Sequence, residues 1–223
     1  MMECALISEP TELDSDRRHG ASPLATLLAE IRACRICRDA PRGLPLPHQP
    51  RPVVRASATA RICVASQAPG TRVHASGLPF TDRSGDRLRQ WMGVTADEFY
   101  DTCRIAIVPM GFCFPGHDPN GGDLPPRPEC ATLWHRQLFA LLPRVELLLL
   151  IGSYAQRWHL GAAASQNLTD TVSRWQQLRD VVPGWSIIVL PHPSWRNNGW
   201  IKRNPWFEID LLPQLRTEVR QRL

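Results

Sequence analysis

A histidine between two prolines is the residue of this sequence best suited to chemistry. His192 lies between Pro191 and Pro193, directly after an apolar stretch that ends at Leu190. Proline fixes φ and removes a backbone donor, so the imidazole is held in a loop and not inside a helix. Its position at the end of an apolar strand favours a functional role. A surface or core position is the alternative for any single histidine.

The same loop continues with Ser194, Trp195 and Arg196. An indole and a guanidinium side by side suit insertion into a stack of bases and contact with a phosphate. The loop therefore favours a nucleic acid as the partner.

A second loop, at residues 66–86, combines turn residues with an aromatic ring. Residues 66–70 read Ser-Gln-Ala-Pro-Gly, and a Pro-Gly pair after a strand turns the chain sharply. Phe80 then offers a flat wall for an aromatic base, or simply packs the loop down. Arg83 and Ser84 begin a helix whose free backbone amides can hold a phosphate.

These loops require a scaffold of strands and helices. Apolar segments that alternate with helical patterns predict an α/β fold, a three-layer αβα arrangement with a central, mostly parallel sheet. Four strands are expected, at residues 61–66, 104–108, 145–151 and 186–190. Ligands of such sheets bind outside the carboxyl ends of the strands. The loops at 67–83, 109–126 and 191–203 should therefore meet at one site.

The helical segments have recognisable starts. Ser22-Pro23 predicts the beginning of a helix that runs to about Cys34. A proline-rich extended arm follows at 38–60, and an amphipathic helix is expected over 128–142. Asn204-Pro205 predicts the start of a last helix, which Pro213 must kink or interrupt.

Length and composition bound the remaining possibilities. The 223 residues, 43% of them hydrophobic, fit one globular domain over residues 21–223 after a polar tail at 1–20. The net charge of +5 favours polyanionic partners only mildly. The tail carries no secretory pattern, and the apolar stretch at 145–152 is too short to cross a bilayer. We expect a cytoplasmic monomer with no membrane partner.

Together, the two loops resemble the motifs of the uracil-DNA glycosylase superfamily. Ser-Gln-Ala-Pro-Gly followed by Gly-Leu-Pro-Phe is similar to its first motif, and His-Pro-Ser to its second. The iron–sulfur branches, families 4 and 5, are the most similar: the Ala-Pro-Gly turn resembles family 4, and the Asp-Arg-Ser-Gly-Asp run family 5. The resemblance covers roughly residues 30–215.

The resemblance implies a DNA base-excision repair glycosylase, a hydrolase that flips uracil or another deaminated base out of DNA and cuts its N-glycosidic bond. It implies that His192 donates to uracil O2 and that Phe80 stacks on the flipped ring. The backbone near Gln67 and Ala68 would face the base. Ser194 and the Ser84 turn would hold phosphates, and Trp195 or Arg196 would fill the gap in the duplex.

The resemblance also implies a cluster held by cysteines. Cys34 and Cys37 form a C-x-x-C pair, Cys113 lies in the loop after the second strand, and Cys130 opens a helix. Four thiolates in such segments suit a structural [4Fe–4S] cluster, with zinc as the alternative. Ordinary buried cysteines are the remaining interpretation.

The sequence departs from family 4 at two positions. Family 4 carries a glutamate where this chain has Gln67, and a carboxamide cannot accept a proton, so Gln67 can only orient the water. The asparagine that reads uracil in family 4 is replaced by Pro109, with Asn120 or Asn197 as substitutes.

These departures leave two alternatives to a deaminated-base glycosylase. One is a catalytically weak or inactive member of the same fold that binds damaged DNA. The other is a hydrolase of free nucleosides or nucleotides, which Trp195 and Arg196 disfavour.

Overall fold

A computed structural model describes residues 21–223 and contains one parallel four-stranded sheet in that part of the chain. The strand order is β2-β1-β3-β4, and every neighbouring pair is parallel. The strands are β1 (Ile62–Ala65), β2 (Ile105–Ile107), β3 (Leu147–Ile151) and β4 (Ser186–Leu190). The predicted α/β fold is confirmed, and each strand lies within its expected segment. The expected tail at 1–20 lies outside the described residues.

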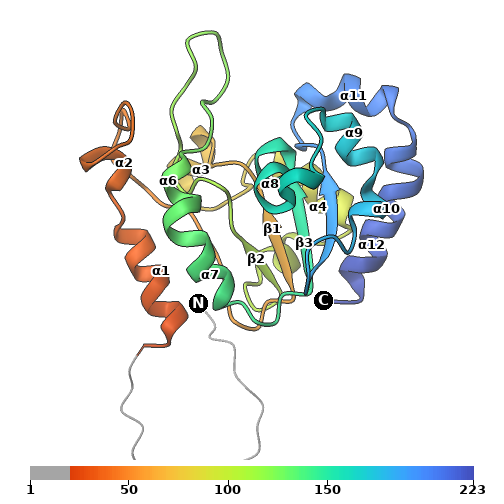
Figure 1. Ribbon diagram of the computed structural model, residues 1–223, viewed down its shortest axis with the longest axis horizontal. Coiled ribbons are helices and arrows are strands. Elements are labelled where there is room, and N and C mark those ends of the chain that lie inside the picture. The colour runs from red at the N-terminus through yellow and green to blue at the C-terminus, as the bar shows by residue number, and fades with distance from the viewer. Residues whose placement is uncertain (1–20) are drawn as a thin grey trace, which may run out of the picture.

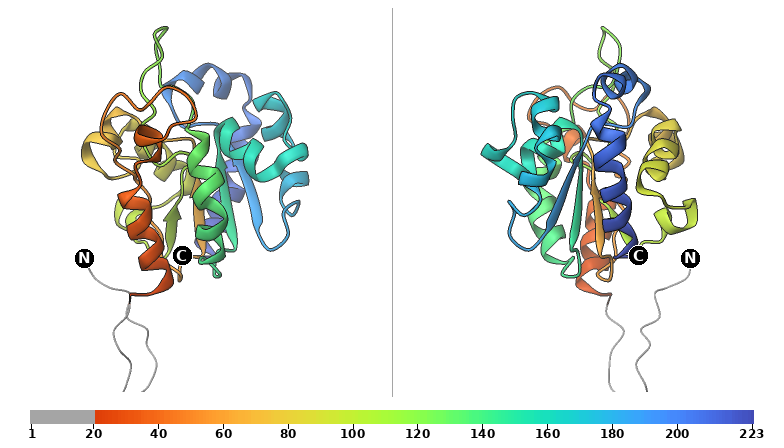
Figure 2. Two further views of the ribbon diagram at one scale, coloured as in Figure 1. Left: turned by 60° about the vertical axis from the view of Figure 1, so that its left-hand side comes forward. Right: turned by 90° about the vertical axis from the view of Figure 1, so that its right-hand side faces the viewer.

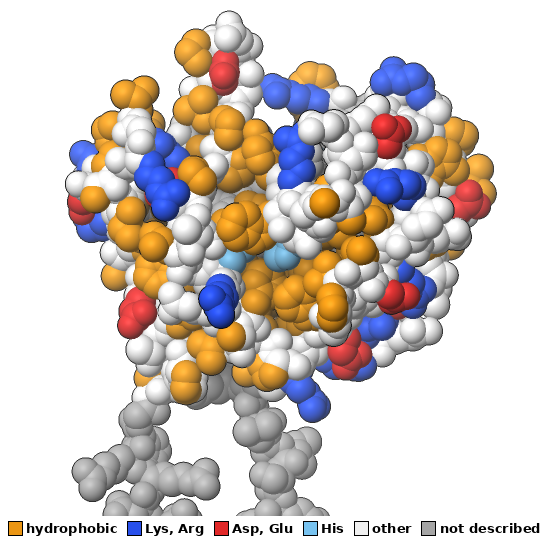
Figure 3. Space-filling view, in the orientation of Figure 1, with side chains coloured by type: hydrophobic (Ala, Val, Ile, Leu, Met, Phe, Trp, Pro, Cys, Tyr) orange, Lys and Arg blue, Asp and Glu red, His pale blue; other side chains and the backbone are white. Residues whose placement is uncertain are grey.

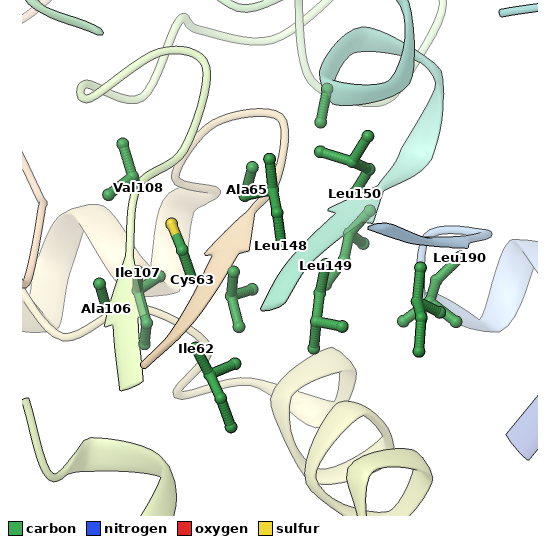
Figure 4. Packing of buried hydrophobic residues seen from close by; sticks show 14 of the residues in the cluster. Ile62, Cys63, Ala65, Ala106, Ile107, Val108, Leu148, Leu149, Leu150 and Leu190 are labelled. Atoms are coloured by element: carbon green, nitrogen blue, oxygen red, sulfur yellow. The ribbon is translucent and has the colours of Figure 1, made fainter. Parts of the chain in front are cut away.

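The strands are apolar because the sheet is covered on both faces. Every residue of β1, β2 and β3 is buried, and only Ser186 of β4 is partly exposed. Continuous apolar runs are typical of strands in this environment. Figure 4 shows these side chains pointing away from both faces of the sheet into the core.

Helices form a layer on each side of the sheet (Figures 1 and 2). Helices α1, α7 and α8 cover one face, while α4 and α12 pack together on the other. The longer helices are α1 (Pro23–Ala33), α4 (Arg83–Met92), α8 (Gly152–Leu160) and α12 (Leu212–Arg220). The shorter helices are α2 (Ile36–Asp39), α3 (Thr71–Ser76), α5 (Ala96–Tyr100), α6 (Pro128–Cys130), α7 (Arg136–Ala140), α9 (Leu168–Ser173), α10 (Trp175–Leu178) and α11 (Asn198–Arg203). None of the described helices is long and apolar enough to span a membrane.

The first helix begins where its cap predicts. The Ser22 side chain accepts a hydrogen bond from the backbone N–H of Ala25, and Pro23 occupies the first turn, where its missing N–H costs nothing. The prolines of the following arm leave the chain without regular structure, except for a single bridge between Arg55 and Ile107. That bridge holds the arm against the edge of the sheet beside β2.

Two expected helices are interrupted by wider turns. The helix expected over 128–142 consists of α6, a π-helical segment (Ala131–His135) and α7, and it ends at Ala140. Near the C-terminus a π-helical segment (Phe207–Leu211) precedes α12, with Pro213 in the first turn of that helix. Pro213 cannot supply the usual backbone donor, which accounts for the predicted interruption.

Candidate active site

One cavity of about 80 Å³ lies at the carboxyl ends of the strands, enough for a single small ring. Its walls come from the loops after β1, β2 and β4, so the predicted meeting of these loops is observed. We call it the base pocket. Of the residues predicted to act at the site, it is lined by Gln67, Ala68, Phe80, Ser84 and His192.

Phe80 is held rigidly in the wall of the pocket. Its φ of 57° makes it the one non-glycine residue with a positive φ among residues 21–223, a conformation that costs about 1–3 kcal/mol. Its carbonyl oxygen accepts hydrogen bonds from Tyr100 Oη (3.0 Å) and Arg89 Nη1 (3.2 Å). Phe99 packs edge-to-face on its ring, with the centroids 5.8 Å apart. These contacts fix the ring, and strain of this kind clusters at functional sites.

His192 enters the pocket from the loop after β4. The Asn197 side chain donates to its carbonyl oxygen over 2.7 Å, which fixes the backbone between the two prolines. Burial lowers the pKa of His192, and the nearby Asp82 carboxylate opposes that shift. The imidazole is therefore neutral at neutral pH and can donate one hydrogen bond into the pocket.

The loop after β1 is fastened to the loop after β2. Ser66 O accepts from Met110 N, and Gln67 O accepts from Gly111 N, both over 2.8 Å. The backbone at the Ala-Pro-Gly turn is thus fixed. The Gln67 side chain lines the pocket, where its carboxamide can orient a water but cannot take its proton.

Pro109 forms a wall of the pocket that offers no free hydrogen-bond donor. It has no N–H, and its carbonyl oxygen is bonded to His135 Nε2 at 3.0 Å. The N–H groups of Val108 and Met110 are bonded to the carbonyls of residues 64 and 66. Neither Asn120 nor Asn197 lines the pocket in this structure, so neither stands beside the Pro109 wall as a replacement for the missing asparagine.

Two carboxylates that the sequence reasoning missed also line the pocket, those of Asp82 and Asp123. Asp82 caps α4: its Oδ1 accepts from Gly85 N over 3.2 Å. The Asp-Arg-Ser-Gly pattern of a helix start could have located it. Asp123 lies in the loop after β2, and no local pattern distinguishes it from the other acidic residues.

A wider groove continues from the pocket across the surface. Besides Asp82 and Asp123, it is lined by Arg83, Ser84 and Trp195. The Trp195 side chain is 73% exposed, which is unusual for an indole. Figure 3 shows Lys and Arg side chains over α11, which follows this loop.

Ser194 and Arg196 line neither hollow. The Ser194 carbonyl accepts from Arg87 Nη1 over 3.2 Å, so α4 anchors this loop. The guanidinium of Arg196 lies over the Trp195 ring, 5.9 Å from its centroid. It also lies against Gly122, where an added Cβ would stand 2.7 Å from Arg196 Nη1.

The four cysteines expected to bind a cluster approach one another between the arm, the loop after β2 and α6. The thiols of Cys37 and Cys130 are in hydrogen-bonding contact, which lowers the pKa of Cys37 and raises that of Cys130. Burial raises the pKa of Cys113 to about 12, and charges on Cys37 and Cys34 would raise it further. All four are free thiols. No group of three or more His, Cys, Asp or Glu side chains in residues 21–223 is arranged to hold a metal ion.

The family model of the uracil-DNA glycosylase superfamily matches residues 54–216. The match includes both sequence motifs and every strand of the sheet. The chain therefore belongs to the uracil-DNA glycosylase superfamily.

Proposed function

We propose that this protein is a monofunctional DNA glycosylase that hydrolyses the N-glycosidic bond of uracil or another deaminated base in DNA. The observation that carries the proposal is that Phe80 and His192 line the same small cavity. A flat ring and a hydrogen-bond donor in one pocket can hold a flipped base by stacking and stabilise it as it leaves.

In the proposed reaction, the bond between C1′ and the base nitrogen breaks and its electron pair leaves with the base. Positive charge develops on the sugar and negative charge on the base. His192 is neutral because burial lowers its pKa, so it donates a hydrogen bond to the base oxygen where the charge develops. Water adds to C1′, which leaves an abasic site and the free base.

The proposed DNA contacts follow the groove. Trp195 is exposed beside the pocket, so it fills the space that the flipped nucleotide leaves. Arg83 and the first turn of α4 hold a phosphate, and Arg196 and Ser194 contribute from the next loop.

The test uses oligonucleotides that each carry one uracil, hypoxanthine, xanthine or mispaired thymine. After incubation with the protein, alkali should cut the strand at the altered base and leave the matched normal oligonucleotide intact. A failure to release any of these bases would exclude the proposal.

The second candidate, a member that binds damaged DNA without turnover, is favoured by Gln67, which cannot activate water, and by the apolar wall at Pro109. It predicts tight binding to uracil or abasic DNA with no base released. A nucleoside hydrolase would instead act on free deoxyuridine as fast as on uracil DNA.

We also propose that Cys34, Cys37, Cys113 and Cys130 hold a structural [4Fe–4S] cluster, with zinc as the alternative. The free thiols come from three segments, and their charges would interact with one another, so the donors have the chemistry that iron–sulfur clusters need. The cluster would fasten the arm to the loop after β2. It takes no part in the proposed bond cleavage.

A further inference from the structure

The loop after β2 folds into a projecting hairpin, residues 116–124, which we call the finger (Figure 1). Its stem is closed by an antiparallel bridge between His117 and Asp123 and by a hydrogen bond from Leu124 N to Gly116 O. Gly121 and Gly122 have φ values of 92° and 102°, which turn the chain at the tip. The finger therefore returns Asp123 from the tip to the rim of the base pocket.

Asp123 lies over the turn that follows β1. Its Oδ2 atom would stand 3.3 Å from a Cβ added to Gly70, so the glycine leaves space for the carboxylate. Gly70 is three residues beyond Gln67, the position where a carboxamide stands in place of a carboxylate that could accept a proton from water. Asp123 lines both the base pocket and the groove, and its side chain is 40% exposed. Solvent water can therefore reach a carboxylate at the rim of the pocket.

The contacts of Asp123 leave one oxygen available. Oδ1 lies 3.4 Å from His117 Nδ1, and His117 Nε2 lies 3.2 Å from Thr71 Oγ1. No hydrogen bond to Oδ2 is formed within residues 21–223. Burial raises the pKa of Asp123 and the charge of Asp82 adds to that shift, while His117 and Arg196 oppose it. A more basic carboxylate is a better acceptor for a proton from water.

Asp82, the other carboxylate of the pocket, differs from Asp123 in what its bonded oxygen does. Its Oδ1 caps α4 through Gly85 N, so it is needed to fix the start of that helix. The Asp123 carboxylate does not cap a helix.

We infer that Asp123 activates the water that Gln67 cannot. This inference rests on the proposed glycosylase function. As the C1′–N bond breaks and the electron pair leaves with the base, the water oxygen bonds to C1′ and its proton passes to the Asp123 carboxylate. That proton then passes to the departing base or to solvent, which regenerates the carboxylate. No other reactant is needed.

The experiment measures single-turnover excision by the full chain against pH. Asp123→Asn should slow excision by about 100-fold or more, since general-base catalysis is worth about 10² to 10⁴. Binding to abasic DNA should stay within about twofold, because the substitution preserves shape. The matched control is Asp118→Asn: Asp118 is in the same finger, accepts from Asn120 N over 2.7 Å and does not line the pocket. It should excise at the wild-type rate.

The dependence of the excision rate on pH distinguishes a catalytic role of Asp123 from a purely structural one. Wild-type activity should fall as the pH drops through the pKa of Asp123, because the protonated acid cannot accept a proton. His117→Ala removes a neighbour that lowers this pKa, so the fall should move to higher pH. Asp123→Glu should keep part of the activity and the same decrease at low pH. The wild-type and His117→Ala profiles both retain Asp123, so their comparison applies even where Asp123→Asn fails to fold.

An active wild type whose Asp123→Asn variant matches it in rate and pH profile would overturn the role of Asp123 and leave the glycosylase proposal intact. If Asp82→Asn abolished the decrease in activity at low pH, and Asp123→Asn kept both the wild-type rate and that decrease, the role would belong to Asp82. A wild type that releases no base from any oligonucleotide overturns both proposals.

Discussion

The backbone of Gly85 lies directly against the carbonyl group of Phe80. A Cβ on Gly85 would stand 1.8 Å from the Phe80 carbonyl oxygen, a distance that no packing can accept. Gly85→Ala must therefore push the start of α4 away from the strained Phe80. We expect a loss of about 3 kcal/mol or more in the free energy of unfolding, measured by urea denaturation. Gly43→Ala is the control, since an added Cβ there meets nothing within 4 Å. Equal stability of the two variants would contradict this packing.

Replacing His192 should remove the donor that stabilises the departing base. We expect His192→Ala to slow single-turnover excision by about 10² to 10³, the usual effect of losing one such donor. Asn197→Ala removes the hydrogen bond that fixes the His192 backbone and should reduce the rate of excision by less. Alkali-induced cleavage of a uracil oligonucleotide measures both. A His192→Ala variant at full rate would show that the imidazole is not the donor.

Two exposed tryptophans provide a matched pair for the DNA contact. Trp195 is 73% exposed beside the groove, and Trp158 is 50% exposed on α8. Trp195→Ala should weaken binding to abasic DNA by about tenfold, because stacking on a base is worth about 1–3 kcal/mol. Trp158→Ala should leave binding unchanged. Fluorescence anisotropy at a fixed salt concentration compares them, and equal affinities would remove Trp195 from the interface.

Two neighbouring histidines predict instability in acid. Burial lowers the pKa of His135 to about 4 and that of His159 to about 3. Above pH 6.5, their unfolded pKa, both histidines are neutral in the folded and the unfolded protein and do not shift the balance between the two. Below pH 6.5 only the unfolded protein takes up their protons, so the free energy of unfolding decreases as the pH falls from 6.5 toward 4. For His135 alone the loss is about 3 kcal/mol.

His135→Gln keeps a donor for the Pro109 carbonyl but does not titrate. Its stability should therefore depend less on pH between 6.5 and 4, as measured by urea unfolding at several pH values. His117→Ala is the control, because the His117 side chain is 62% exposed. An unchanged pH dependence in His135→Gln would show that His135 does not carry the effect.

A cysteine substitution tests the proposed cluster. Protein purified without oxygen should be brown and contain iron, and Cys34→Ala should lose both properties. Cys63→Ala should keep them, since Cys63 is fully buried on β1 and only burial shifts the pKa of its thiol. Colourless protein with one zinc per chain would favour the alternative, and protein with neither metal would exclude both.

The fold could be predicted because its strands are apolar along their whole length. Strands such as β3, with five buried residues in a row, need helices on both faces, and this requirement fixes the layers. The interruption before Pro213 was also predictable, since proline lacks the donor. The π-helical segment between Cys130 and Arg136 was not, because a widened turn depends on tertiary packing and leaves no local pattern.

The meeting of the loops after the strands could be predicted, because topology alone decides it. Phe80 and His192 follow parallel strands, and the ends of such strands meet at one edge of the sheet. Asp123 could not be predicted, because its position depends on the pairing of one bridge in the finger. A shift of that pairing by one residue would turn its carboxylate away from the pocket. Asn197 was expected near the base and instead holds the His192 backbone.

The bond between Pro109 and His135 has a consequence for base selection. In the proposed reaction, a polar edge of a base gives up its water on entering the pocket, and the wall at Pro109 has no donor to replace that water. A keto oxygen therefore gains no hydrogen bond from this wall, and the wall does not select for it. In the proposed reaction, discrimination must arise elsewhere in the pocket, from His192, the Gln67 carboxamide and the fixed backbone of the Ala-Pro-Gly turn.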